Sequence, residues 1–159
     1  FTNVGQRPVN RTSASAGQDA LNTAVEVLND GDLFGIYPEG TRSPDGRLYK
    51  GKTGVARIAL ASGAQVIPVA MIGTRDVNPI GTWFPRPGKV RVKVGDPIYP
   101  IEFVNNRGLE RDSYEAIRAL TDHIMRQLQQ LSGQEYADVY AAEVKKALAE
   151  GGDSSPHNP

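Results

Sequence analysis

The predicted fold is set by residues 33–43, LFGIYPEGTRS, in which a short apolar run leads into a polar turn. The run 33–37 is ended by Pro38, a pattern typical of a buried strand. Residues 53–62 place apolar side chains on one helical face ahead of a glycine, and residues 66–72 form a second apolar run. Strand, helix and strand in this order predict a βαβ unit with parallel strands.

Further patterns extend this unit on both sides. They comprise a strand-like segment at 8–11, an amphipathic helix at 19–29, an alternating strand at 90–94, a helix capped by Asp112 or Ser113 that ends at Gly133, and a last helix at 135–149. We therefore expect an α/β fold with a mostly parallel sheet flanked by helices. One domain is expected over residues 1–150, followed by a disordered tail, 151–159, rich in Gly, Ser and Pro.

Composition excludes several classes of function. The 18 Lys and Arg residues balance 18 Asp and Glu residues, so composition does not indicate a general affinity for nucleic acid or for an anionic membrane, and any anion site must be local. Cysteine is absent and there are 2 histidines, which argues against a disulfide framework, a cysteine nucleophile or a metal cluster. The longest uncharged stretch, 58–74, is interrupted by polar residues and a proline, so no segment is expected to cross a membrane.

Candidate binding residues follow the predicted strands. Ligands of open parallel sheets collect outside the carboxyl ends of strands, where this chain places Arg11 after one strand and residues 38–43 after the next. If the two strands are neighbours, Arg11 and Arg42 share a crevice and can bind a phosphate ester through bidentate hydrogen bonds. Lys50 and Lys52 could add positive charge. The alternative is that Glu39 and Arg42 pair with each other in a solvated loop.

Two other patterns compete with this interpretation. Residues 46–53, GRLYKGKT, match the G-x-x-x-x-G-K-[ST] phosphate loop of NTPases and kinases, although a polar turn and not a strand precedes them. A loop at 83–87, WFPRP, combines aromatic rings with a cation, and could rest on a membrane interface or pack over the sheet edge. His123 is expected on the surface, on the flank of its helix.

The run 34–43 also closely resembles the third conserved block of the 1-acylglycerol-3-phosphate acyltransferase family, F-P-E-G-T-R-S. Residues 5–11 resemble the family's second block, and residues 66–69 its fourth, whose proline is Pro68. The resemblance implies a glycerol-3-phosphate acyltransferase-like fold and transfer of an acyl group from acyl-CoA, or another acyl carrier, to the hydroxyl of a lysophosphatidic acid. No cofactor is implied beyond acyl-CoA as co-substrate.

The resemblance also assigns roles to residues. It implies that the acceptor phosphate is bound by Arg11, Glu39, Gly40, Thr41 and Arg42, and that Pro68 lies on the acyl-donor side. The family's general base is a histidine in an H-x-x-x-x-D block, and no such block occurs in this sequence. Asn10 and Pro8 also depart from the second block.

We expect the catalytic block upstream of Phe1, so this chain alone is predicted to be inactive. The resemblance further implies a peripheral location on the cytoplasmic face of a membrane. A non-catalytic phosphate-binding module is the second alternative. Acyl-chain length, the exact acceptor and the oligomeric state are not indicated by the sequence.

Overall fold

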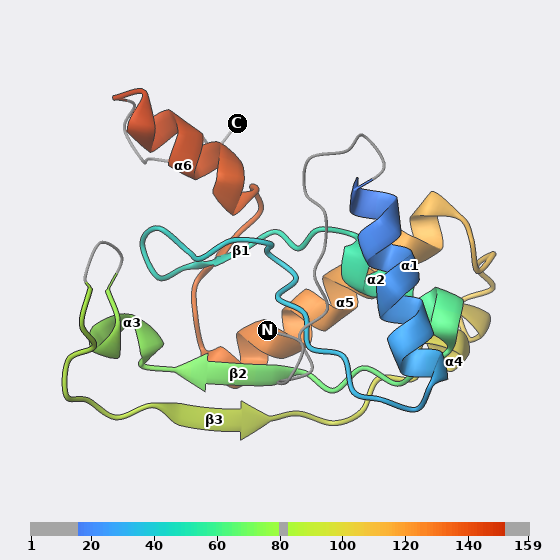
Figure 1. Ribbon diagram of the computed structural model, residues 1–159. Coiled ribbons are helices and arrows are strands. Elements are labelled where there is room, and N and C mark those ends of the chain that lie inside the picture. The colour runs from blue at the N-terminus through green and yellow to red at the C-terminus, as the bar shows by residue number, and fades with distance from the viewer. Residues whose placement is uncertain (1–15, 80–82, 152–159) are drawn as a thin grey trace.

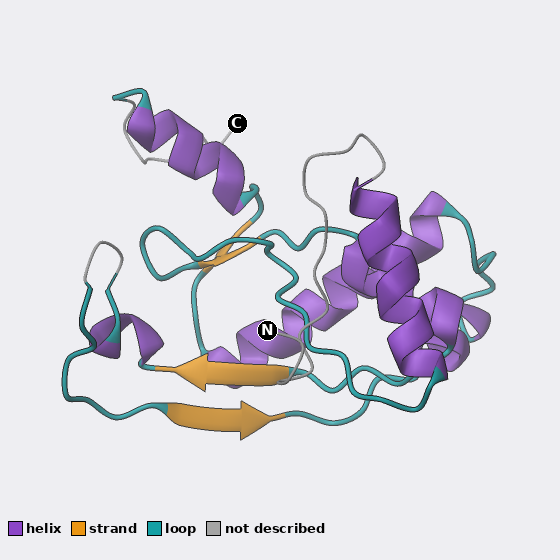
Figure 2. Cartoon of the chain, viewed as in Figure 1, coloured by secondary structure: helices purple, strands orange, loops and turns teal. Residues whose placement is uncertain are grey.

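The computed structural model describes residues 16–79 and 83–151, and Figure 1 shows their arrangement. Helices and strands alternate along much of the chain, as Figure 2 shows by colour. The elements are α1 (Ala16–Asn29), β1 (Leu48–Tyr49), α2 (Gly54–Ser62), β2 (Val69–Ile72), α3 (Thr74–Val77), β3 (Arg91–Val94), α4 (Pro100–Asn105), α5 (Tyr114–Ser132), β4 (Tyr136–Ala137) and α6 (Ala141–Ala149).

Local signals define the helix ends as the sequence predicts. Ser113 caps α5, because its hydroxyl accepts a hydrogen bond from the Ala116 amide at 3.0 Å. Gly133 ends the same helix with φ 71°, a conformation that glycine adopts without steric cost. Gly63 ends α2 in the same way, with φ 72°. The predicted helices at 19–29, at 53–62 and from Ser113 to Gly133 are thus confirmed, with boundaries shifted by a few residues.

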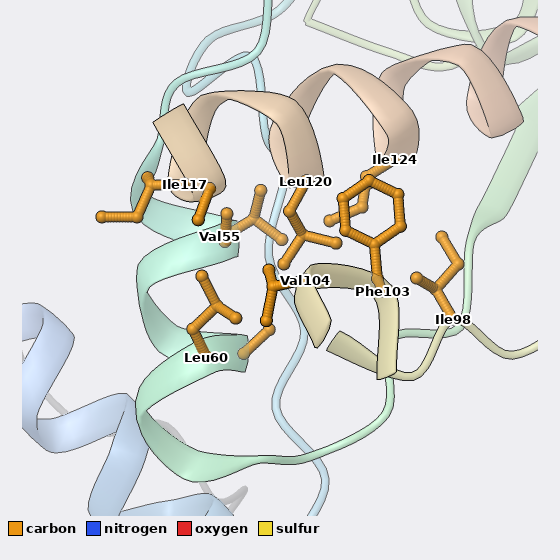
Figure 3. Packing of buried hydrophobic residues seen from close by; sticks show 11 residues of the cluster. Val55, Leu60, Ile98, Phe103, Val104, Ile117, Leu120 and Ile124 are labelled. Atoms are coloured by element: carbon orange, nitrogen blue, oxygen red, sulfur yellow. The ribbon is translucent and has the colours of Figure 1, made fainter. Parts of the chain in front are cut away.

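The main core lies where α2 and α4 pack against α5. Its central side chains include Leu60, Val104, Leu120 and Ile124, which point toward one another in Figure 3. Thr121 is the buried polar residue of this region, and its hydroxyl donates to the Ile117 carbonyl at 2.7 Å. Helix α1 packs on α2 outside this core, through a stripe that buries Ala24.

Within the described ranges the strands form two small sheets. β1 pairs with β4 in parallel, and β2 pairs with β3 in an antiparallel register that places Val69 opposite Val94. A mixed fold with a parallel strand pair and flanking helices confirms the predicted α/β class. Pro68 immediately precedes β2 and is buried, and its carbonyl accepts from the Gly95 amide at 2.9 Å. Proline cannot donate the return hydrogen bond to Gly95, which fits its position just before the first paired residue of the strand.

The predicted strand at 33–37 is wrong. These residues form a loop, and Leu33 and Tyr37 are 99% and 74% exposed. The antiparallel partner of β2 is β3, and no strand of the described residues lies against 33–37. An apolar run forms a strand only where a neighbour accepts its backbone hydrogen bonds, so local pattern alone was not sufficient.

The last predicted helix is also revised. Residues 136–137 form β4 beside β1, and α6 begins only at Ala141. Strand β1 and the short helices α3 and α4 carried no strong periodic signal. The predicted strand at 8–11 lies outside the described residues, as does all of the predicted tail except Gly151. Within the described part, the helices are too short or too polar to pass through a bilayer.

Candidate functional site

The turn at residues 38–41 is the centre of the candidate site. The Gly40 amide donates to the Tyr37 carbonyl at 3.0 Å, and Gly40 has φ 70°, which favours glycine over residues with a Cβ. The Lys52 amide donates to the Pro38 carbonyl at 2.8 Å, which ties the turn to the start of α2. The chain between these points folds back, so residues a dozen positions apart lie side by side.

Glu39 anchors this turn to strand β1. Its carboxylate Oε1 accepts a hydrogen bond from the Tyr49 amide at 2.7 Å. Burial raises the pKa of Glu39 above its usual value, while the Tyr49 amide and the positive charge of Lys145 oppose the increase. The carboxylate therefore holds the backbone of β1, which makes Glu39 a residue that positions the turn.

Two ammonium groups approach the same turn. A Cβ placed on Gly40 would lie 3.1 Å from Cδ and 3.4 Å from Nζ of Lys52, so the lysine passes directly over the glycine. Lys145, from α6, donates from Nζ to the Thr41 hydroxyl at 2.7 Å. Sequence reasoning missed Lys145, because nothing in its local pattern relates it to a turn that lies 104 positions earlier.

Arg42 points toward a different segment. Its guanidinium donates to the backbone carbonyl of Asn78, just after α3. Arg11 lies outside the described residues, so the predicted pairing of Arg11 with Arg42 stays a prediction. Arg42 and Glu39 are not an ion pair in the structure, since each side chain has another partner.

Lys50 contacts residues that follow β4 and not the turn at Gly40. Its Nζ lies 2.9 Å from the Asp138 carboxylate and 5.9 Å from the centre of the Tyr140 ring. The hydrogen bond to Asp138 raises the pKa of Lys50. Of the two lysines named from the sequence, the structure brings only Lys52 to the turn at Gly40.

The loop that leads into β1 is fixed by a polar network. Asp45 Oδ2 lies 2.7 Å from Nε of Arg47 and accepts from the Tyr49 hydroxyl at 2.8 Å. Burial acts to raise the pKa of Asp45, but hydrogen bonds from the Arg47 amide, the Tyr49 hydroxyl and the Arg47 side chain lower it to about 2. The network holds the loop in one conformation beside the turn.

The phosphate-loop pattern at 46–53 does not form a phosphate loop. Such a loop binds phosphate with free backbone amides. Here the amides of Leu48 and Lys50 donate to carbonyls of the β4 region, and those of Tyr49 and Lys52 donate to Glu39 and Pro38. Leu48 and Tyr49 are buried inside the pattern as strand β1. The NTPase alternative is therefore not supported.

His123 is half-buried rather than fully on the surface. Its ring centre lies 4.8 Å from that of Phe103 in α4. Burial lowers the pKa of His123, with smaller contributions from Arg126 and Arg107. The histidine thus packs against α4 and is not part of the turn. Acidic and histidine side chains of the described residues form no group of three or more that could hold a metal ion.

Comparisons with known proteins agree with the sequence motifs. The profile of the Acyltransferase family matches residues 1–72. A chloroplastic 1-acyl-sn-glycerol-3-phosphate acyltransferase of Brassica napus is 36% identical over 97 residues, which is 60% of this chain and 28% of that protein. A 1-acyl-sn-glycerol-3-phosphate acyltransferase of Bacillus subtilis is 27% identical over 124 residues, or 78% of this chain and 56% of that protein.

A solved structure is also similar. It is the 1-acyl-sn-glycerophosphate acyltransferase PlsC of Thermotoga maritima, with a TM-score of 0.56 and 36% sequence identity. The match covers 70% of this chain and 44% of that chain. The chain thus spans between about a quarter and just over half of the proteins named here.

Proposed function

We propose that this chain, whose residues 1–72 match the Acyltransferase family profile, supplies the acceptor-phosphate site of an enzyme that acylates 1-acylglycerol-3-phosphate. The acyl donor in this proposal is acyl-CoA and the product is phosphatidic acid, an intermediate of phospholipid synthesis. The enzyme would work as a peripheral protein on the cytoplasmic face of a membrane, since both its acceptor and its product are lipids.

The observation that carries the proposal is the pair of lysines at the Gly40–Thr41 turn. Lys145 contacts a neutral hydroxyl, and neither Lys52 nor Lys145 forms an ion pair with a carboxylate of the described residues. A phosphate dianion beside the turn would meet two ammonium groups and the Thr41 hydroxyl. Charge-assisted hydrogen bonds of this kind are about twice as strong as neutral ones.

The neighbouring residues fit this role in different ways. Glu39 accepts a hydrogen bond from the Tyr49 amide, so it shapes the turn from the side of β1. Gly40 leaves room for the Lys52 side chain to lie against the turn, because no Cβ intervenes. We propose that Arg42 leaves the Asn78 carbonyl or bridges it to the phosphate when the acceptor binds, and that Arg11 joins it as the second guanidinium.

In the proposed reaction the acceptor hydroxyl oxygen attacks the thioester carbonyl of acyl-CoA. The new C–O bond forms, the C–S bond breaks, and CoA leaves as the thiol. The proton of the hydroxyl passes to a general base, which we place in an H-x-x-x-x-D block outside this chain. This chain binds and orients the acceptor, with Pro68 on the side of the acyl donor.

The test is made in a full-length enzyme that contains this domain. Arg42→Ala is expected to lower kcat/KM for lysophosphatidic acid by roughly 10- to 150-fold, the effect of losing one charge-assisted contact worth about 1.5–3 kcal/mol. Arg126→Ala, which replaces an exposed arginine of α5, is the matched control and should leave kcat/KM unchanged. An unchanged value for Arg42→Ala would count against the proposal.

A second measurement uses this chain by itself. It should bind sn-glycerol 3-phosphate in a calorimetric titration yet transfer no label from acyl-CoA. Turnover by the chain alone would disprove its predicted inactivity. Binding without transfer in the full-length protein would instead favour the non-catalytic phosphate-binding module.

A further inference from the structure

A cationic and aromatic segment follows α3. From Val77 to Val94 the sequence contains no Asp or Glu, although the whole chain has equal numbers of acidic and basic residues. The segment carries four cations, which are Arg86, Lys89, Arg91 and Lys93. Its two aromatic residues, Trp83 and Phe84, are 91% and 77% exposed. Large exposed rings beside unbalanced positive charge indicate an interaction surface.

The base of this segment is fixed next to the candidate site. The Arg86 amide donates to the Val77 carbonyl at 2.6 Å, so the chain returns to the end of α3. A Cβ on Gly88 would lie 2.7 Å from Cγ2 of Val77, which shows how closely the returning chain packs there. Arg42 donates to the Asn78 carbonyl at the same base. The described ends of the segment that joins α3 to β3 in Figure 1 are thus held beside Arg42 of the third block.

We propose that Trp83, Phe84, Arg86 and Lys89 form a docking surface for an anionic lipid membrane. Tryptophan and phenylalanine partition into the interface between headgroups and acyl chains, while arginine and lysine bind anionic headgroups. Pro85 and Pro87 limit the conformations of the loop, so less entropy is lost when it inserts. The absence of any carboxylate between Val77 and Val94 removes the repulsion that an anionic surface would otherwise meet.

This inference rests on the proposed function and extends it. A lysophosphatidic acid acceptor has its phosphate at the membrane surface. A loop that inserts beside Arg42 places the turn at Gly40 near the level of the headgroups. The acceptor could then reach the site without leaving the bilayer.

The test uses the protein's single tryptophan, Trp83, as a reporter. Intrinsic fluorescence is measured while vesicles are added to the full chain. Vesicles of phosphatidylcholine with phosphatidylglycerol should shift the emission to shorter wavelength and protect it from iodide quenching. Vesicles of phosphatidylcholine alone should have a much smaller effect, and high salt should reverse the binding.

Matched variants separate this surface from other parts of the molecule. Removing one charge by Arg86→Gln or Lys89→Gln should weaken vesicle binding about fivefold, the effect of one basic residue near an anionic surface. Lys146→Gln, an exposed cation on α6, should not weaken it. Phe84→Ser should weaken binding, whereas Tyr114→Ser, an aromatic residue 69% exposed at the start of α5, should not.

Three outcomes would overturn the inference. The first is an emission spectrum that anionic vesicles do not change. The second is equal binding by the loop variants and their controls. The third is a short-wavelength emission without vesicles that depends on protein concentration, which would mean that a second copy covers the loop. Each leaves the proposed function standing if the chain still binds soluble sn-glycerol 3-phosphate.

Discussion

Replacing Lys145 by methionine removes one positive charge from the turn at Gly40 and keeps a side chain of similar length. In the structure Nζ of Lys145 donates to the Thr41 hydroxyl at 2.7 Å, and its charge acts on Glu39. A hydrogen bond from such a charged group to phosphate is worth about 1.5–3 kcal/mol. Because the lysine is only half-buried, solvent screening favours the lower end. Lys145→Met should therefore weaken sn-glycerol 3-phosphate binding about tenfold.

The assay is a calorimetric titration of this chain with sn-glycerol 3-phosphate at low ionic strength. Lys146→Met is the control, since Lys146 lies on the same helix with its side chain 76% exposed and 3.9 Å from Glu150. Both variants remove one charge from α6, so a general electrostatic effect would change both affinities equally. Equal affinities for the two variants would refute the assignment of Lys145 to the site.

A third variant distinguishes binding from tethering. Thr41→Val removes the hydroxyl that Lys145 contacts but keeps the ammonium group. If Lys145 only ties α6 to the turn, Thr41→Val should reproduce the full loss of affinity. If the ammonium binds the phosphate, as we expect, Thr41→Val should cost clearly less than Lys145→Met.

The remaining predictions concern the turn, its polar support and the core. Gly40→Ala and Gly63→Ala both force alanine into φ near 70°, which should lower the free energy of unfolding by about 1–2 kcal/mol. Only the Gly40 variant should also weaken sn-glycerol 3-phosphate binding, because its Cβ would meet the Lys52 side chain, whereas nothing lies within 4 Å of a Cβ at Gly63. The pKa of Asp45 is lowered from 3.8 to about 2, so its stabilisation is complete above pH 4 and disappears as the pH falls through 2. With a third of its side chain exposed, that stabilisation is about 1 kcal/mol after screening, and Asp45→Asn should remove this pH dependence of the denaturation midpoint. Leu120 is 0% exposed, so Leu120→Ala should lower the free energy of unfolding by about 2–5 kcal/mol and Tm by roughly 10 °C. Leu33 is 99% exposed, so Leu33→Ala should change Tm by no more than about a degree or two in differential scanning calorimetry.

The sequence by itself determined the elements whose signals are local. Ser113 and Gly133 define α5 because capping depends on a hydroxyl within one turn and on a residue that tolerates positive φ. The third-block residues 38–43 were recognisable for a similar reason, since a contiguous motif keeps its order whatever surrounds it. That motif indicated the acyltransferase family, and the family profile that matches residues 1–72 agrees with it.

Only the tertiary structure decided which residues meet across the chain. It left 33–37 exposed although the run is apolar, because a strand needs a partner that no local pattern supplies. Residues 136–137 form a strand because β1 lies beside them, and Lys145 donates a hydrogen bond to the Thr41 hydroxyl. Lys50 forms an ion pair with Asp138, whereas the Lys52 side chain lies against Gly40. Such contacts depend on the packing of segments far apart in sequence, so their energy is not encoded within any single stretch of residues.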